Sequence, residues 1–199
     1  MTSIRLHQQR LVVLSGLFLT CYSFTVHVVY PLQTRILSEQ WIPVYLLFLP
    51  HAVRVLGAWL YGWTSVLYLL PGAVAMALIW SPVGPLRPEA VAMYAATLLS
   101  APLSFELIHC WRGTAQDPGQ RRMDWRMTVM AGLLAGAFNA LALLVTVGYA
   151  QPLGDRISAM VTVLLGNLLG MVASLFILLL GFRLVERHYL RRRRGSGGF

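Results

Sequence analysis

The stretch Leu47–Trp63, LFLPHAVRVLGAWLYGW, decides how the rest of the sequence is interpreted. It is apolar enough to lie in a membrane, yet Pro50, His51 and Arg54 fall within about one and a half helical turns. Ionisable side chains are costly in the hydrocarbon core, so they face the interior of a helix bundle and find polar partners there. The stretch therefore predicts a membrane helix that carries an internal polar site.

The composition around this stretch is that of an integral membrane protein. Apolar residues make up 57% of 199 residues and charged residues 12%, and the mean hydropathy is +0.65. A soluble domain is usually about half apolar and a quarter charged. The length allows about six spans of roughly 20 residues each and leaves no room for a soluble catalytic domain. All 16 basic residues are Arg, and because most of them flank apolar segments, the net charge of +9 indicates membrane topology rather than nucleic-acid binding.

Six apolar segments follow one another along the chain, and we predict an all-α, polytopic bundle of six transmembrane helices that forms one domain over residues 1–190. Trp and Tyr mark several segment ends, as expected where helices meet the lipid headgroups. The first segment has no signal-peptide cleavage site and is expected to be retained. Residues 191–199 are expected to form a basic, flexible tail. The predicted spans are residues 11–30, 41–61, 63–80, 89–111, 127–150 and 158–185.

Arginine is distributed unequally between the two sides of this bundle. With six spans both termini share one side, which carries twelve arginines against three on the other, with Arg54 inside the membrane. Positively charged flanks stay in the cytoplasm, so we predict that both termini are cytoplasmic, in a bacterial inner membrane. Clustered Arg is expected to attract anionic lipid headgroups or a docking partner. The clustered residues are Arg121, Arg122, Arg191, Arg192, Arg193 and Arg194.

Four ionisable residues define a predicted intramembrane pocket between the second and fourth spans. His51 and Arg54 lie three residues apart, as do Glu106 and His109, so each pair shares one helix face. Arg54 and Glu106 fall in the same half of the bilayer, and an ion pair between them is favoured over two isolated buried charges. The four residues either line a binding pocket or form one salt bridge that pins two helices together, and both interpretations stay open.

We find no catalytic or cofactor motif of high specificity. Glu-x-x-His is the spacing of di-metal carboxylate sites, but such a site needs two of these motifs and two further Glu, and the chain has one motif. Axial ligation of a haem or chlorin by His27, His51 or His109 stays an open alternative that no specific motif supports. Cys21 and Cys110 lack the spacing of a zinc site or a disulfide framework and are expected to act as small apolar side chains.

The last two predicted spans contain glycines four residues apart, which let helix backbones approach closely. Two asparagines lie near mid-depth on the same spans and are expected to hydrogen-bond across them. The pattern serves either packing within the chain or dimerisation. The predicted packing residues are Gly132, Gly136, Asn139, Gly166, Asn167 and Gly170.

The run FLPHAVRVLGAWLYGWTSVLYLLPGAVAMAL has a Pro followed by a helix face, an aliphatic stretch, a Gly turn and an aromatic-flanked helix with Pro-Gly. Over about residues 47–78 it resembles the second and third helices of bacterial membrane-associated sensor domains of the MASE type. His51 and Arg54 stand where that pattern has small residues. The resemblance implies a sensory module, expected here to stand alone and to act through a partner.

The sequence therefore favours a non-enzymatic integral membrane module, either a sensory domain or an accessory subunit of a larger membrane complex. We expect it to work with a membrane-protein partner or as a homo-oligomer. The alternative is a small-solute transporter or substrate-binding subunit that uses the predicted pocket. Pro50, Pro71 and Pro102 lie inside three consecutive spans and support this alternative, since broken helices at mid-depth mark binding sites in transporters.

Overall fold

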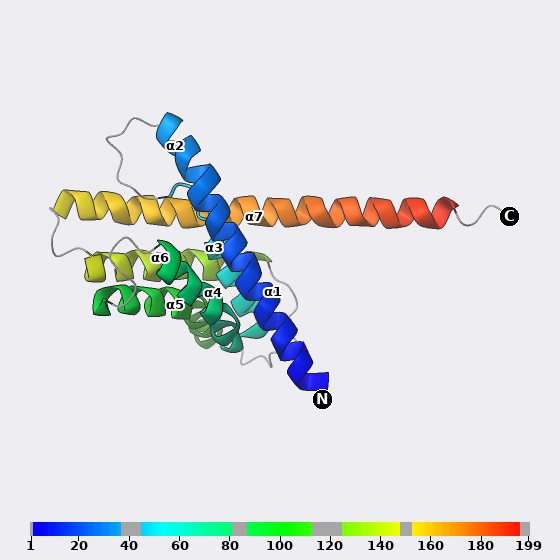
Figure 1. Ribbon diagram of the computed structural model, residues 1–199, viewed down its shortest axis with the longest axis horizontal. Helices are drawn as coiled ribbons and strands as arrows, with labels where there is room; N and C mark the ends of the chain where they lie inside the picture. The colour runs from blue at the N-terminus through cyan, green and yellow to red at the C-terminus, as the bar shows by residue number, and fades with distance from the viewer. Residues whose placement is uncertain (1, 37–44, 81–86, 113–124, 148–152, 196–199) are drawn as a thin grey trace.

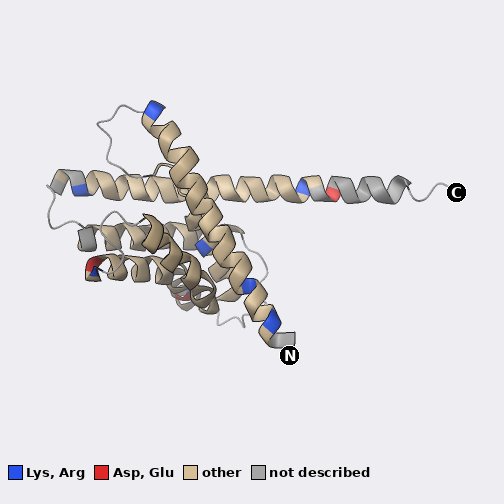
Figure 2. Cartoon of the chain, viewed as in Figure 1, with Lys and Arg blue, Asp and Glu red and all other residues tan. Residues whose placement is uncertain are grey.

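The computed structural model describes residues 2–36, 45–80, 87–112, 125–147 and 153–195. All regular structure in these ranges is helical, which confirms the predicted all-α class for this part of the chain. Four helices are long and apolar enough to cross a membrane, and long stretches of them carry no charge (Figure 2). They cover Ile4–Ile36, Pro88–Arg112, Trp125–Val145 and Arg156–Leu184.

The N-terminal part is one continuous rod made of α1 (Thr2–Phe24), the π-helix η1 (Thr25–Val29) and α2 (Tyr30–Ile36). Within η1 the Tyr30 N–H reaches the Thr25 carbonyl, and the Thr25 hydroxyl donates to the Cys21 carbonyl at 2.9 Å. The rod extends past both ends of the predicted span at 11–30. In Figure 1 it runs at a steep angle to the long C-terminal helix.

The predicted second span is helical only in its second half. Helix α3 begins at Pro50 and ends at Tyr61, a length of 12 residues or about 18 Å, whereas the hydrocarbon core is about 30 Å thick. Residues 45–49 are not helical, and residues 41–44 lie outside the described residues. Proline explains the start of α3, because it fits the first turn of a helix while its ring clashes with the carbonyl four residues earlier.

A single tight turn joins α3 to α4 (Thr64–Trp80). Gly62 there has φ +57° and ψ −136°, a backbone conformation that is open to glycine and strained for other residues. Helix α4 has 17 residues and contains Pro71. At about 25 Å it is shorter than the four long apolar helices.

The C-terminal half contains α5 (Pro88–Arg112), α6 (Trp125–Val147) and α7 (Leu153–Gly195). In Figure 1 these three helices run alongside one another, and α7 continues far beyond the ends of α5 and α6. Its 43 residues correspond to about 64 Å. The tail predicted at 191–199 is thus helical as far as Gly195, and residues 196–199 lie outside the described part.

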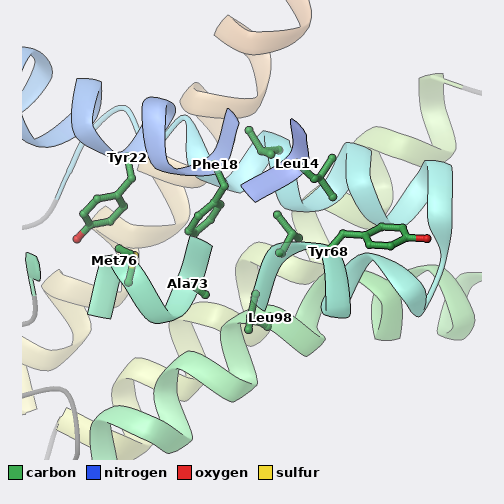
Figure 3. Packing of buried hydrophobic residues seen from close by; sticks show 9 residues of the cluster. Leu14, Phe18, Tyr22, Tyr68, Ala73, Met76 and Leu98 are labelled. Carbon is green, nitrogen blue, oxygen red and sulfur yellow. The ribbon is translucent and has the colours of Figure 1, made fainter. Parts of the chain in front are cut away.

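Two apolar clusters hold these helices together. In the first, Leu14, Phe18 and Tyr22 of α1 face Tyr68, Ala73 and Met76 of α4 (Figure 3). The second surrounds α3, where Ala52, Val55 and Ala58 pack with residues of α5, α6 and α7. Helix α3 contacts α1, α4, α5, α6 and α7, so this short helix is the hub of the bundle.

Candidate functional site: a polar cluster around α3

Two ionisable side chains lie at the centre of the bundle, on the short helix α3. His51 and Arg54 are each 1% exposed, because other helices surround α3. An isolated charge in such a place is strongly unfavourable unless hydrogen bonds compensate it. The partners of these two residues therefore determine what the site can do.

His51 is hydrogen-bonded through both ring nitrogens. Its Nε2 lies 3.0 Å from the Gly132 carbonyl of α6, and its Nδ1 lies 3.2 Å from Nη2 of Arg54. A carbonyl can only accept a hydrogen bond and a guanidinium can only donate. The contacts therefore assign His51 as the neutral tautomer with its proton on Nε2.

Arg54 connects α3 to α5. Its Nη1 donates to the Thr97 carbonyl at 2.8 Å, and its Cζ lies 5.7 Å from the centre of the Phe48 ring, within cation–π range. Its Nε is buried and has no hydrogen-bond partner within the described part of the chain. The guanidinium is thus held by neutral acceptors and one aromatic ring.

Thr97 extends the network to α6. Its hydroxyl donates to Oδ1 of Asn139 at 2.6 Å, and its carbonyl also accepts from the Ser100 hydroxyl at 2.8 Å. We call His51, Arg54, Thr97 and Asn139 the polar cluster. Sequence reasoning missed Thr97, although a row of hydroxyls at 97, 100 and 104 beside Pro102 was a visible signal.

The expected ion pair between Arg54 and Glu106 is not formed. Both residues are described, and the hydrogen bonds of Arg54 go to Thr97 and His51 instead. Glu106 lies nine residues after Thr97 on α5, which is about two and a half turns and about 13 Å along the axis. The half turn places Glu106 on the opposite face of α5 from Thr97, where Arg54 does not reach.

His109 is also separate from the polar cluster. It is 8% exposed, and neither of its ring nitrogens has a hydrogen-bond partner among the residues that the structure covers. It follows Thr97 by twelve residues, about 18 Å along α5. The four residues therefore do not form one pocket. His51 and Arg54 lie in the polar cluster, whereas Glu106 and His109 lie near the end of α5.

Gly166 and Gly170 of α7 are in close contact with a non-helical stretch of backbone and not with another helix. A Cβ atom at Gly166 would lie 2.0 Å from the Tyr45 carbonyl oxygen, and one at Gly170 would lie 2.3 Å from the Phe48 carbonyl oxygen. The Phe48 N–H donates to the Gly166 carbonyl at 3.0 Å. We call residues 45–49 the strap, since they lie along this glycine groove.

Backbone hydrogen bonds tie the strap to two other parts of the chain. In addition to the bond from Phe48, the Leu46 N–H donates to Oε1 of Gln33 at 2.8 Å. Irregular backbone at membrane depth is tolerated only where protein or a water-filled cavity surrounds it. The strap and α3 together form one segment that is helical only from Pro50 onward.

Gly132 and Gly136 bring α6 close to α7. A Cβ at Gly132 would lie 2.1 Å from Sδ of Met171, and one at Gly136 would lie 3.6 Å from Cβ of Asn167. The expected bond between the two asparagines is not made, because Asn139 pairs with Thr97. Nδ2 of Asn167 is buried without a partner in the described ranges.

Of the remaining predicted residues, only some fall in the described part of the chain. Arg121 and Arg122 fall outside the described residues, and Arg191–Arg194 belong to the last part of α7. His27 is exposed on η1, with its ring 6.2 Å from that of Trp80. No group of three metal-ligating side chains occurs among the described residues.

No protein family, curated protein or solved structure matches this chain.

Proposed function

We propose that the chain is a non-enzymatic integral membrane module of six crossings, with both ends in the bacterial cytoplasm. Four crossings are the long apolar helices, and α4 is a fifth. The second crossing is the strap followed by α3. The strap advances along α7 from Gly166 to Gly170, about 6 Å, and the twelve residues of α3 add about 18 Å, so together they cover most of a hydrocarbon core of about 30 Å.

A sensory or accessory role is supported above all by the continuity of α7. This helix carries Gly166 and Gly170, against which the strap lies, and it continues without interruption to Gly195. The 25 residues from Gly170 to Gly195 correspond to about 37 Å. A shift of the strap would tilt a rigid helix that reaches the cytoplasmic face, where clustered arginines attract anionic lipid or a partner. A sensory role is also what the resemblance of residues 47–78 to MASE-type sensor domains implies.

A solute-binding or transport role is the second candidate. It is favoured by the discontinuous crossing and by the surplus of donors around it, since the buried unpartnered atoms there are Nε of Arg54 and Nδ2 of Asn167. A ligand for such a place would carry hydrogen-bond acceptors or negative charge.

One pair of variants separates the two roles. In an accessory or sensory module, replacement of Arg191–Arg194 by Gln releases a co-purifying membrane protein while the helical circular dichroism spectrum is unchanged. Reconstituted vesicles then show no solute flux that depends on His51. Flux that is abolished by His51→Ala and unaffected by the Arg191–Arg194 replacement would support the transporter and contradict the module.

A further inference from the structure

A hollow of about 490 Å³ opens on the surface of the bundle between α5 and α6. It faces outward, since Trp111 is 79% exposed and Leu133 is 48% exposed. All of its walls are apolar. The lining residues are Leu107, Ile108, Trp111, Met130, Leu133 and Leu134.

Two arginines lie at the end of this hollow. Helix α5 ends at Arg112 and α6 begins at Trp125, so the last turn of α5 and the first turn of α6 are at the same end of the pair. Nη2 of Arg112 lies 3.7 Å from Sδ of Met130, which lines the hollow. Cζ of Arg126 lies 5.5 Å from the Trp125 ring, and both arginines are exposed.

We propose that this hollow and these arginines form a binding site for one anionic phospholipid. The upper part of an acyl chain lies in the hollow, and the phosphate lies beside Arg112 and Arg126. Guanidinium groups bind phosphate through paired, charge-assisted hydrogen bonds, and basic pockets between membrane helices bind anionic headgroups. The site rests on the proposed membrane location of the chain and identifies a ligand for its cytoplasmic end.

The dimensions favour a lipid chain over a partner helix. From Leu107 to Trp111 the wall rises by four residues, or about 6 Å, which is little more than one helical turn. A docked helix would need contact over several turns, whereas the upper part of an acyl chain fits this length. The apolar walls accept a neutral lipid equally well, so the arginines supply the preference for negative charge.

Lipid retention measured by native mass spectrometry tests this site. The protein is reconstituted in equal amounts of phosphatidylglycerol and phosphatidylcholine, extracted in mild detergent, and its bound lipids are counted. We expect wild type to retain phosphatidylglycerol preferentially and Arg112→Gln/Arg126→Gln to lose that preference by about fivefold for each arginine. The matched control Arg5→Gln/Arg183→Gln removes two exposed arginines elsewhere and should leave the preference intact.

A second variant tests the hollow itself. Leu133→Phe adds volume to the wall and should reduce the retention of both lipids, with the protein still folded. Equal retention of the two lipids by wild type, or equal loss of preference in both double variants, would overturn the lipid site alone. A wild-type protein that does not enter vesicles at all would overturn the membrane module and the lipid site together.

Discussion

Nη1 of Arg54 donates a 2.8 Å hydrogen bond to the carbonyl of Thr97, and this contact ties the hub helix α3 to α5. The Thr97 hydroxyl then passes the connection on to Asn139 of α6. A cation at the centre of a bundle is thus compensated by a carbonyl, an imidazole and an aromatic ring. Three helices depend on one side chain, so the stability of the bundle is expected to respond strongly to its loss.

Arg54→Met should lower the free energy of unfolding by about 1–3 kcal/mol, because Nδ1 of His51 then lacks its donor. Glu106→Gln should change it by less than about 0.5 kcal/mol, the usual size for a substitution that breaks no such contact. Thermal unfolding in mild detergent, followed by circular dichroism, measures both.

The double variant Arg54→Met/Glu106→Gln tests whether Arg54 and Glu106 are independent of each other or form an ion pair. With no contact between the residues, the two effects should add to within about 0.5 kcal/mol. Comparable large losses in each single variant, partly recovered in the double variant, would show that the charges are paired after all.

Gly170→Ala should destabilise the bundle by about 1–3 kcal/mol, since the added Cβ would lie 2.3 Å from the backbone oxygen of Phe48 and force the strap to move. The matched control is Gly181→Ala in the same helix, where nothing lies within 4 Å of the added atom. That control should be neutral or slightly stabilising. If the two variants unfold at the same temperature, the strap does not lie on the glycine groove.

Thr97→Val and Asn139→Leu should each cost about 0.6 kcal/mol and at most about 1.7 kcal/mol, the mean and the maximum found for hydrogen bonds between membrane helices. Their effects should be less than additive, because either change already removes the 2.6 Å bond. Thr20→Val is the control, since the Thr20 hydroxyl bonds only within its own exposed helix turn. Full additivity of the Thr97 and Asn139 effects would contradict the contact.

Several features of this fold are readable from the sequence because they depend on local composition. The long apolar segments predict the helices α1, α5, α6 and α7, and the two ionisable residues of Leu47–Trp63 predict a buried polar site on one helix. The glycine spacing predicts close approach at α6 and α7. These inferences need only the period of a helix and the cost of burying charge.

Other features depend on tertiary partners that leave no local pattern. The apolar residues before Pro50 are as suitable for a helix as for a strap, and the glycine groove of α7 decides between them. Backbone carbonyls at Gly132 and Thr97 hold His51 and Arg54, and a carbonyl has no signature in a sequence. The sequence therefore predicts only a charged partner for Arg54, namely Glu106.

The central proposal is that the strap and α3 carry the chain across the membrane although residues 45–49 are not helical. Cysteine labelling with an impermeant reagent tests this directly, in a background where Cys21 and Cys110 are replaced by Ser. Single cysteines are placed at Leu37, before the strap, and at Trp63, which is 48% exposed in the turn after α3. We predict that Leu37→Cys reacts only from outside intact cells and Trp63→Cys only in inverted vesicles. Labelling of both positions from the same side would show that the segment enters and leaves through one face, and would contradict the six-crossing bundle.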